Sequence, residues 1–203
     1  MDTKESLIIK EAGKLLAKVG PLAMTMDAVA HNCGISKRTL YEVFPDKKSL
    51  IRQCLDLEHA KHDKELKEIF ESSANCFEAL FRTYKQIRLY LQGGAYKVGE
   101  EVARIYPDIF EDHAEKEKRI VRQLSGLLAK AQTEGHVVQA IDTDIASFLF
   151  LSSIRNINDS ERIGEYGFDR IDVFDGAFIN FLRGIATRSG IEFIDDNLAK
   201  FEK

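Results

Sequence analysis

The side chains best suited to contacting another molecule gather between residues 25 and 48, and they are hydroxyl and cationic groups. Thr25 and Ser36 each precede a short stretch with helical character. A hydroxyl oxygen at a helix start accepts a hydrogen bond from a backbone N–H that otherwise has no partner. Gly34 lies between the two stretches, where a sharp turn with positive φ costs glycine almost nothing. The spacing therefore predicts two short helices joined by a tight turn.

The predicted second helix leaves a polar and basic surface at its start. The apolar residues Val29, Ile35, Leu40 and Phe44 are spaced to pack into one small core, and Ala30 lets the helices cross closely. This is the pattern of a helix-turn-helix, whose second helix enters the DNA major groove with its N-terminal residues. The same spacing also occurs by chance in helical hairpins, but here the two caps and the basic surface agree with it. We predict DNA contacts by Thr25, Ser36, Lys37, Arg38, Thr39, Tyr41, Lys47 and Lys48.

The charge of the chain is divided in a way that fits this prediction. The 203 residues carry a net charge of −4, yet residues 1–54 hold nine Lys or Arg against six Asp or Glu. The N-terminal part is therefore at +3 and the remainder at −7. A basic end on an acidic body is expected to bind phosphates at that end alone.

Residues 7–54 resemble the DNA-binding domain of the TetR family of bacterial transcriptional regulators. The resemblance rests on residues in the order Ile8-Ile9-Lys10-Glu11-Ala12, Val19-Gly20, Thr25, Val29-Ala30, Gly34-Ile35-Ser36, Thr39-Leu40-Tyr41, Phe44 and Lys47-Lys48-Ser49-Leu50. Arg38 stands where many members carry glycine, and Ala17 replaces a frequent phenylalanine. The resemblance implies an all-α fold with a three-helix helix-turn-helix domain over 1–45 and a helical effector-binding and dimerisation domain over 46–203. It also implies a repressor that binds double-stranded operator DNA and is controlled by a small-molecule effector.

The rest of the chain shows helical periodicity throughout, without an alternating strand pattern or a repeat. Asp46 is suited to cap a long helix, and Gly93-Gly94, Pro107 and Gly135 mark breaks. We predict helices at about 46–72, 76–91, 98–105, 108–133, 144–157 and 171–188.

The last of these helices carries a continuous apolar stripe at steps of three and four residues. In TetR-like proteins the last two long helices of each subunit pack as a four-helix bundle in a homodimer, and two half-sites about 34 Å apart require a dimer. An ordinary core within one chain would produce the same stripe. Under the dimer interpretation, the interface residues are Phe150, Phe174, Phe178, Phe181, Leu182 and Ile185.

A second group of apolar residues is spread over the middle helices. The resemblance implies an effector cavity in this region, although aromatic residues at helical spacing are more often packed core. The candidate pocket residues are Phe77, Phe81, Tyr84, Leu91, Phe110, Phe148 and Leu151.

Other kinds of chemistry find little support in the sequence. His59 and His62 have the spacing of a metal pair, but their surroundings are polar on all sides, so we expect a solvated surface and no metal. Cys33 and Cys54 fall on apolar positions, which favours buried thiols over a redox sensor. Motifs of nucleophilic or phosphate-binding enzymes are absent. We expect a cytoplasmic protein that is not an enzyme and has no cofactor or membrane partner; a chromosome-organising protein or a helical adaptor are the alternatives.

Overall fold

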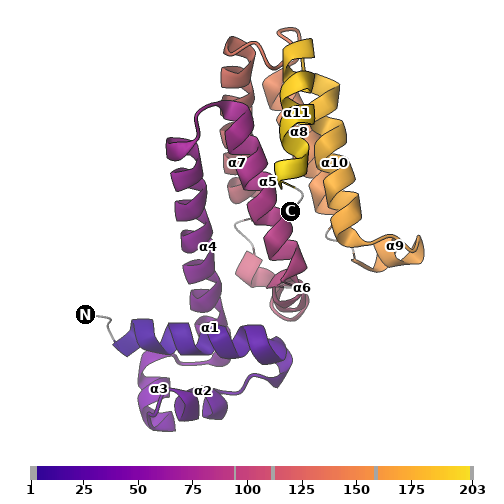
Figure 1. Ribbon diagram of the computed structural model, residues 1–203. Helices are drawn as coiled ribbons and strands as arrows, with labels where there is room; N and C mark the ends of the chain where they lie inside the picture. Colours follow the sequence, from indigo (N-terminus) through magenta and orange to yellow (C-terminus); the bar gives the residue numbers. More distant parts are fainter. Residues whose placement is uncertain (1–3, 94, 111–112, 158–159, 202–203) are drawn as a thin grey trace. The chain divides into compact units, whose positions relative to one another are not determined.

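The computed structural model describes residues 4–93, 95–110, 113–157 and 160–201, and these residues are almost entirely helical. In this part of the chain, β-structure is limited to one isolated bridge between Val137 and Ala186. The residues form two compact units, Met1–Leu66 with Gly94–Glu111 (unit 1) and Lys67–Gly93 with Asp112–Lys203 (unit 2). Figure 1 labels the helices of both units. The predicted all-α fold with an N-terminal helix-turn-helix and a helical C-terminal part is confirmed.

Unit 1 begins with three helices, α1 (Lys4–Ala23), α2 (Met26–Asn32) and α3 (Lys37–Val43). The turn between α2 and α3 has the expected form, because Gly34 adopts φ +63°. Val29, Leu40 and Phe44 are buried in one cluster, against which Ile35 packs. The small core predicted from the sequence is therefore confirmed.

Unit 1 also contains a segment from much later in the chain. Helix α6 (Ala95–Ile105) and the short 3₁₀ helix η1 (Pro107–Phe110) follow the first part of α4 (Lys47–Ser72) in this unit, and α6 lies against α1. Val102 of α6 is 0% exposed within the core of α1–α4, and Val98, Tyr106 and Ile109 pack against that core. The core around the helix-turn-helix is thus completed from outside the first quarter of the sequence.

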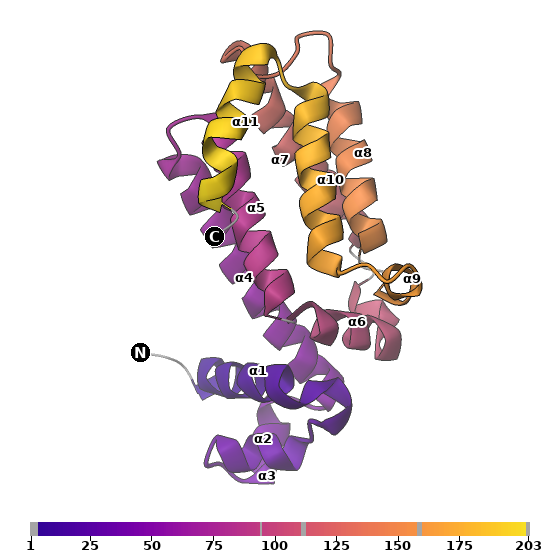
Figure 2. The ribbon, with the colours of Figure 1, turned by 45° about the vertical axis from the view of Figure 1, so that its right-hand side comes forward.

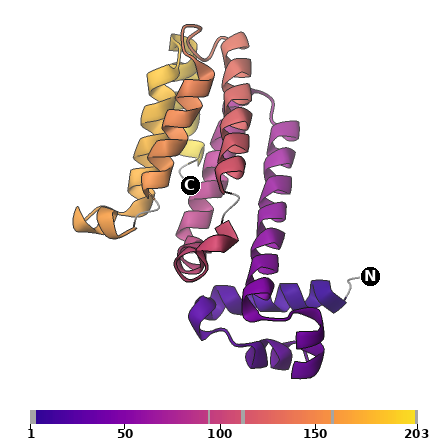
Figure 3. The same ribbon diagram turned by 180° about the vertical axis from the view of Figure 1, so that it is seen from behind.

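Unit 2 is a bundle built on α5 (Cys76–Gln92), α7 (His113–Thr133), α8 (Thr143–Ile157), α9 (Ser160–Glu165), α10 (Arg170–Ile185) and α11 (Arg188–Phe201). Helices α8 and α10 run side by side (Figure 2), and α7 lies along α8 (Figure 3). The centre is aromatic. The ring of Tyr84 on α5 stacks on Phe178 of α10 at 4.4 Å between centroids, and Phe77 meets Phe193 of α11 edge to face at 5.7 Å.

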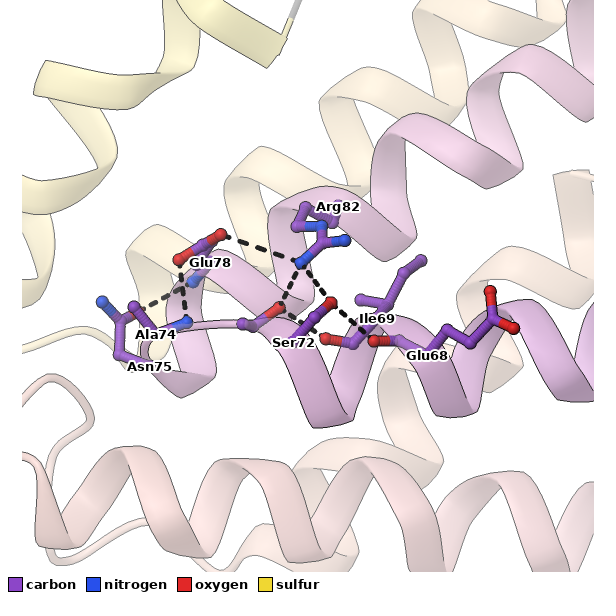
Figure 4. Close-up of polar contacts among 8 residues, drawn as sticks. Glu68, Ile69, Ser72, Ala74, Asn75, Glu78 and Arg82 are labelled. Atoms are coloured by element: carbon purple, nitrogen blue, oxygen red, sulfur yellow. Dashed lines mark hydrogen bonds and ion pairs between the residues drawn. The ribbon is translucent and has the colours of Figure 1, made fainter.

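The junction from α4 to α5 is held by polar contacts within unit 2 (Figure 4). The Arg82 guanidinium donates to the hydroxyls of Ser72 and Ser73 at 2.9 and 3.2 Å, at the C-terminal end of α4. Asn75 caps α5 by accepting from the Glu78 N–H, and the Glu78 carboxylate accepts from the Ala74 N–H. A cation at a helix C-terminus and a capping side chain at the next N-terminus both stabilise helix ends, so this junction has a defined geometry.

The predicted helix 171–188 is wrong at its C-terminal end. Helix α10 stops at Ile185, Ala186 is extended, and α11 begins at Arg188. Thr187 caps the new helix by accepting from the Gly190 N–H, and a Cβ on Gly190 would lie 2.2 Å from the carbonyl oxygen of His136. The break depends on this close approach of a distant segment, which periodicity does not report.

Other helix boundaries also differ from the prediction. The expected helix 108–133 is divided into η1 and α7, with residues 111–112 between them outside the described residues, and α6 begins at Ala95 instead of 98. Helix α9 was not predicted. The contacts divide the chain after Leu66 and again around α6; the functional boundary after residue 45 stays a prediction.

Candidate nucleic-acid interface

All eight residues predicted to contact DNA lie in unit 1, on or next to α2, α3 and the start of α4. Thr25 caps α2 by accepting from the Ala28 N–H at 3.1 Å. Ser36 caps α3 by accepting from the Thr39 N–H at 3.1 Å, and the Ser36 and Thr39 hydroxyls are 2.9 Å apart. Tyr41 is exposed on α3. The two caps fix where α3 begins and so which side chains its first turn presents.

Lys37, the first residue of α3, is paired with an acid from α2. Its Nζ lies 2.6 Å from Oδ1 of Asp27, and both side chains are more than half exposed. The hydrogen bond to Asp27 raises the pKa of Lys37 above its usual value, with a further contribution from the charge of the same carboxylate. Lys37 is therefore cationic at any physiological pH, and the pair joins the starts of the two helices.

Arg38 is paired within its own helix. Its Nε donates to Oε1 of Glu42 at 3.1 Å, and the two side chains are 90% and 61% exposed. The basic face predicted from Lys37 and Arg38 is thus accompanied by two carboxylates.

The two lysines at the start of α4 have different surroundings. Lys47 donates to the backbone carbonyl of Leu22, at the end of α1, at 3.3 Å. Lys48 lies 2.5 Å from the Asp108 carboxylate in η1, and Arg52 donates to the Asp108 backbone carbonyl at 3.2 Å. The hydrogen bond from Lys48 lowers the pKa of Asp108, so that pair stays charged well into the acidic range. Lys47 is therefore bound to the end of α1, and Lys48 to η1.

The comparisons with known proteins agree with this geometry. Residues 8–54 match the model described as bacterial regulatory proteins, tetR family. A transcriptional regulator from Cytophaga hutchinsonii ATCC 33406 shares the fold with a TM-score of 0.74 at 20% identity, over 89% of this chain and 97% of that one. Residues 8–54 thus form a DNA-binding domain of the TetR type.

Further solved structures share the fold of this chain over nearly its whole length. The TetR-family protein CprB from S. coelicolor A3(2) has a TM-score of 0.67 at 19% identity, covering 98% of this chain and 96% of that one. A gamma-butyrolactone receptor, described as ArpA-like, has a TM-score of 0.69 at 18% identity, with 98% and 96% covered. No curated protein matches the sequence significantly. The chain therefore shares the fold of these proteins, and residues 8–54 contain the TetR-type helix-turn-helix.

The residues predicted to line an effector pocket differ in burial, and they belong to both units. Phe77, Phe81, Tyr84 and Leu91 are buried in the centre of unit 2, where the aromatic rings pack on α10 and α11. The remaining three are arranged differently, with Phe148 exposed on α8, Leu151 partly buried, and the Phe110 side chain outside the described residues.

An open apolar hollow of about 340 Å³ lies elsewhere in unit 2. Its walls come from α8, α9, α10 and the segment before α10, namely Ser153, Ile157, Ile163, Tyr166, Phe168, Val173 and Ala177. Tyr166 and Phe168 stack at 6.0 Å. None of these residues was selected from the sequence as a pocket residue, because they are scattered over three helices and the segment before α10.

The residues predicted to form the dimer interface are mostly buried by their own chain. Phe174, Phe178, Leu182 and Ile185 are nearly inaccessible in the single protomer, whereas Phe150 and Phe181 stack on one another at 4.4 Å and are half-buried. A side chain already covered by its own chain has little apolar area left to bury against a partner. For those four residues the structure favours the alternative of an intrachain core.

The burial of the cysteines and the surroundings of the histidines bear on thiol and metal chemistry. Cys54 and Cys76 are buried and Cys33 is partly buried, which agrees with buried thiols. Among the described residues there is no group of three or more His, Cys, Asp or Glu placed to hold a metal ion, and His62 lies 3.6 Å from Glu65. No helix in the described part of the chain combines the length and apolarity needed to cross a bilayer.

We expect native Cys54 and Cys76 to resist alkylation at pH 8. Burial raises the pKa of Cys54 to about 12, and burial with a hydrogen bond to Glu134 raises that of Cys76 to about 11. Because the thiolate is the nucleophile, only about one Cys54 thiol in ten thousand is reactive at that pH. Mass spectrometry after timed exposure to iodoacetamide should show Cys33 modified first. In urea the three should react alike, and equal native rates for Cys33 and Cys54 would contradict this expectation.

Sequence reasoning did not single out the acids that pair with the predicted DNA-contacting residues, namely Asp27, Glu42 and Asp108. The four-residue spacing of Arg38 and Glu42 is a signal for an ion pair on a helix. Asp27 and Asp108 meet their lysines only through tertiary packing, so the sequence contains no local signal for them.

Proposed function

We propose that this regulator is a dimeric repressor that binds operator DNA through α2, α3 and the start of α4, and that a small-molecule effector lowers its affinity. The observation that carries the DNA-binding part is the exposed N-terminal part of α3, which presents Lys37, Arg38 and Tyr41 directly after the Ser36 cap. In this motif, residues at that place contact base edges.

The dimeric state is supported by an apolar face on α8. Ile145, Phe148 and Leu149 are 57%, 54% and 60% exposed, and their spacing puts them on one side of the helix. Large apolar side chains gathered on one exposed face indicate a protein interface. A second copy of this chain is the occupant we propose, because an operator with two half-sites is read by a dimer.

The effector part of the proposal rests on two observations. Helix α4 is continuous from Lys47, beside the helix-turn-helix, to Ser72, where Arg82 of α5 holds its end. Unit 2 also contains the apolar hollow between α8, α9 and α10, and a protein of the same fold is a gamma-butyrolactone receptor. An effector that prefers one orientation of α4 would change the spacing between the helix-turn-helix domains of the two subunits. The effector can shift the equilibrium between the two orientations of α4 only by the difference between its binding free energies for them, typically about 1–3 kcal/mol.

The test is selection of bound duplexes from randomised DNA, followed by affinity measurements over a range of salt concentrations. A two-fold symmetric preferred sequence supports the proposal, and its occurrence in promoters supports regulation. Preferred sites scattered along the chromosome would favour the chromosome-organising protein, whereas salt-independent or absent binding would favour the adaptor.

Two substitutions separate base contacts from phosphate contacts. Arg38→Ala should relax the preference at one base position in each half-site, because arginine can hold guanine O6 and N7 with two hydrogen bonds. Lys47→Ala should weaken binding to all sequences about equally and reduce the salt slope by roughly one unit per half-site. Fluorescence anisotropy with the selected and scrambled duplexes measures both effects. An unchanged preference for Arg38→Ala would mean that Arg38 contacts only phosphate.

A further inference from the structure

Glu42 is the acid nearest to the arginine on the exposed face of α3. Its Oε1 accepts from Arg38 Nε at 3.1 Å, one helical turn away. Among the described residues, Nε is the Arg38 nitrogen with a hydrogen-bond partner, and neither terminal nitrogen has one. The carboxylate therefore contacts the side of the guanidinium and leaves its end open.

This ion pair contributes little to the stability of α3. Both side chains are mostly exposed, and exposed pairs between flexible side chains are weak. The helix dipole disfavours a cation in the first turn and an anion in the last turn, and α3 has both. The order of the pair, with the base before the acid, is also the weaker one for a helix. Helix stability gives no reason for Glu42 at this position.

The geometry of the Arg38 guanidinium gives a reason for an acid at position 42. Its N–H groups form a rigid planar fork, so fixing Nε also fixes the direction of the two terminal nitrogens. Those two nitrogens are the pair that binds O6 and N7 of a guanine. Even a weak bond at Nε favours the rotamers that direct the terminal nitrogens outward, so Arg38 has less rotational freedom to lose when it meets the base.

We propose that Glu42 is a positioning residue for base readout: it orients Arg38 so that the terminal fork reads one guanine in each half-site. Its negative charge also opposes the DNA phosphates, so it lowers affinity for DNA of unrelated sequence. The inference rests on the proposed DNA-binding function and adds a specificity-determining residue to it.

The neighbouring pair supplies a matched control. Asp27 forms an ion pair with Lys37, with 2.6 Å between Oδ1 and Nζ, as Glu42 does with Arg38. A lysine ammonium is a point charge without a planar fork, so orienting it carries no comparable information about a base. Asp27→Asn should therefore raise affinity for all sequences without changing the preferred one.

The experiment compares base preferences of the wild type with Glu42→Ala, Glu42→Gln, Arg38→Ala, Asp27→Asn and the double variant Arg38→Ala/Glu42→Ala, using the full-length protein and randomised duplexes. Arg38→Ala should lose roughly 5- to 100-fold discrimination at one position per half-site. Glu42→Ala should lose at least about threefold at that same position and bind scrambled DNA more tightly. Glu42→Gln should keep most of the preference, because its amide oxygen still accepts a hydrogen bond.

The outcomes separate the inference from the function on which it rests. If the wild type selects no sequence, the proposed function fails. If it selects a site and folded Glu42→Ala keeps the full preference at the Arg38 position, Glu42 is not a positioning residue although the function stands. If Glu42→Ala still changes the preference when Arg38 is already alanine, Glu42 contacts a base directly and the inference is overturned. Circular dichroism and thermal unfolding of each variant confirm that the protein remains folded.

Discussion

Replacing Phe148 and Leu149 together with glutamate should turn the dimer into folded monomers that bind operator at least about 100-fold more weakly. Both side chains are more than half exposed on α8, so their substitution disturbs no core of the protomer. If a second copy covers them, each glutamate would be buried without a partner, which costs more than the association gains. Loss of the second half-site removes the avidity of linked sites, typically 10²- to 10⁴-fold.

Light scattering on the eluting protein measures the mass, and anisotropy with the selected duplex measures the affinity. Leu89→Glu is the matched control, because Leu89 is 57% exposed and lies on α5 instead of α8. It should leave the dimer intact. A dimer that persists in the Phe148→Glu/Leu149→Glu variant would place the interface on another face.

Phe178→Ala should destabilise the protein by about 3–5 kcal/mol without a specific effect on association. Phe178 is 4% exposed and packs on Tyr84, Phe81 and Phe150, with ring centroids 4.4, 5.7 and 6.2 Å away. Alanine would leave a cavity where three rings meet, and dense packing around it limits how far the neighbours relax. The sequence suggested that this ring belongs to a dimer interface, for which the expected result would be different.

Urea denaturation at two protein concentrations distinguishes the two interpretations. A cavity lowers the free energy of unfolding by the same amount at every protein concentration. A weakened dimer lowers it mainly at low protein concentration. Phe181→Ala is the control, since Phe181 is half-buried and stacks mainly on Phe150, and it should cost clearly less. If Phe178→Ala unfolds like the wild type at high concentration and loses stability only on dilution, Phe178 belongs to the dimer interface.

The helix-turn-helix could be predicted because the information for it is local. Thr25, Gly34 and Ser36 act on backbone groups within three residues of themselves, and each is found in the predicted role. The apolar residues around them lie close together in the sequence. Within such a short segment, residue spacing and tertiary packing impose the same pattern.

The core of unit 2 was harder to assign, because an apolar stripe shows that a helix face is covered without showing what covers it. Phe174 and Phe178 form the predicted stripe on α10, but the covering surface is the protein's own Tyr84 and neighbouring rings. The exposed face of α8 was hidden in the run Phe148–Leu151, which is apolar on every side. Which of its residues are exposed is decided by the positions of α7 and α10.

Contacts between distant segments account for the rest. The pairing of Lys48 with Asp108 spans 60 residues, and the end of α10 depends on Gly190 approaching His136. Neither pair has a periodicity or a motif, and a single sequence gives no means of detecting such contacts.

The presence of Val102 in the core of α1–α4 has a consequence for how regulators of this kind can exchange parts. A genetic crossover after residue 66 would transfer the DNA-reading helices but leave behind α6, whose Val102 and Val98 fill and cover their core, together with Tyr106, which follows α6. The hybrid would then depend on whatever α6 its new body supplied. Retargeting this regulator by domain shuffling therefore takes two junctions in place of one, and changes of operator by point substitution on α3 are the easier route.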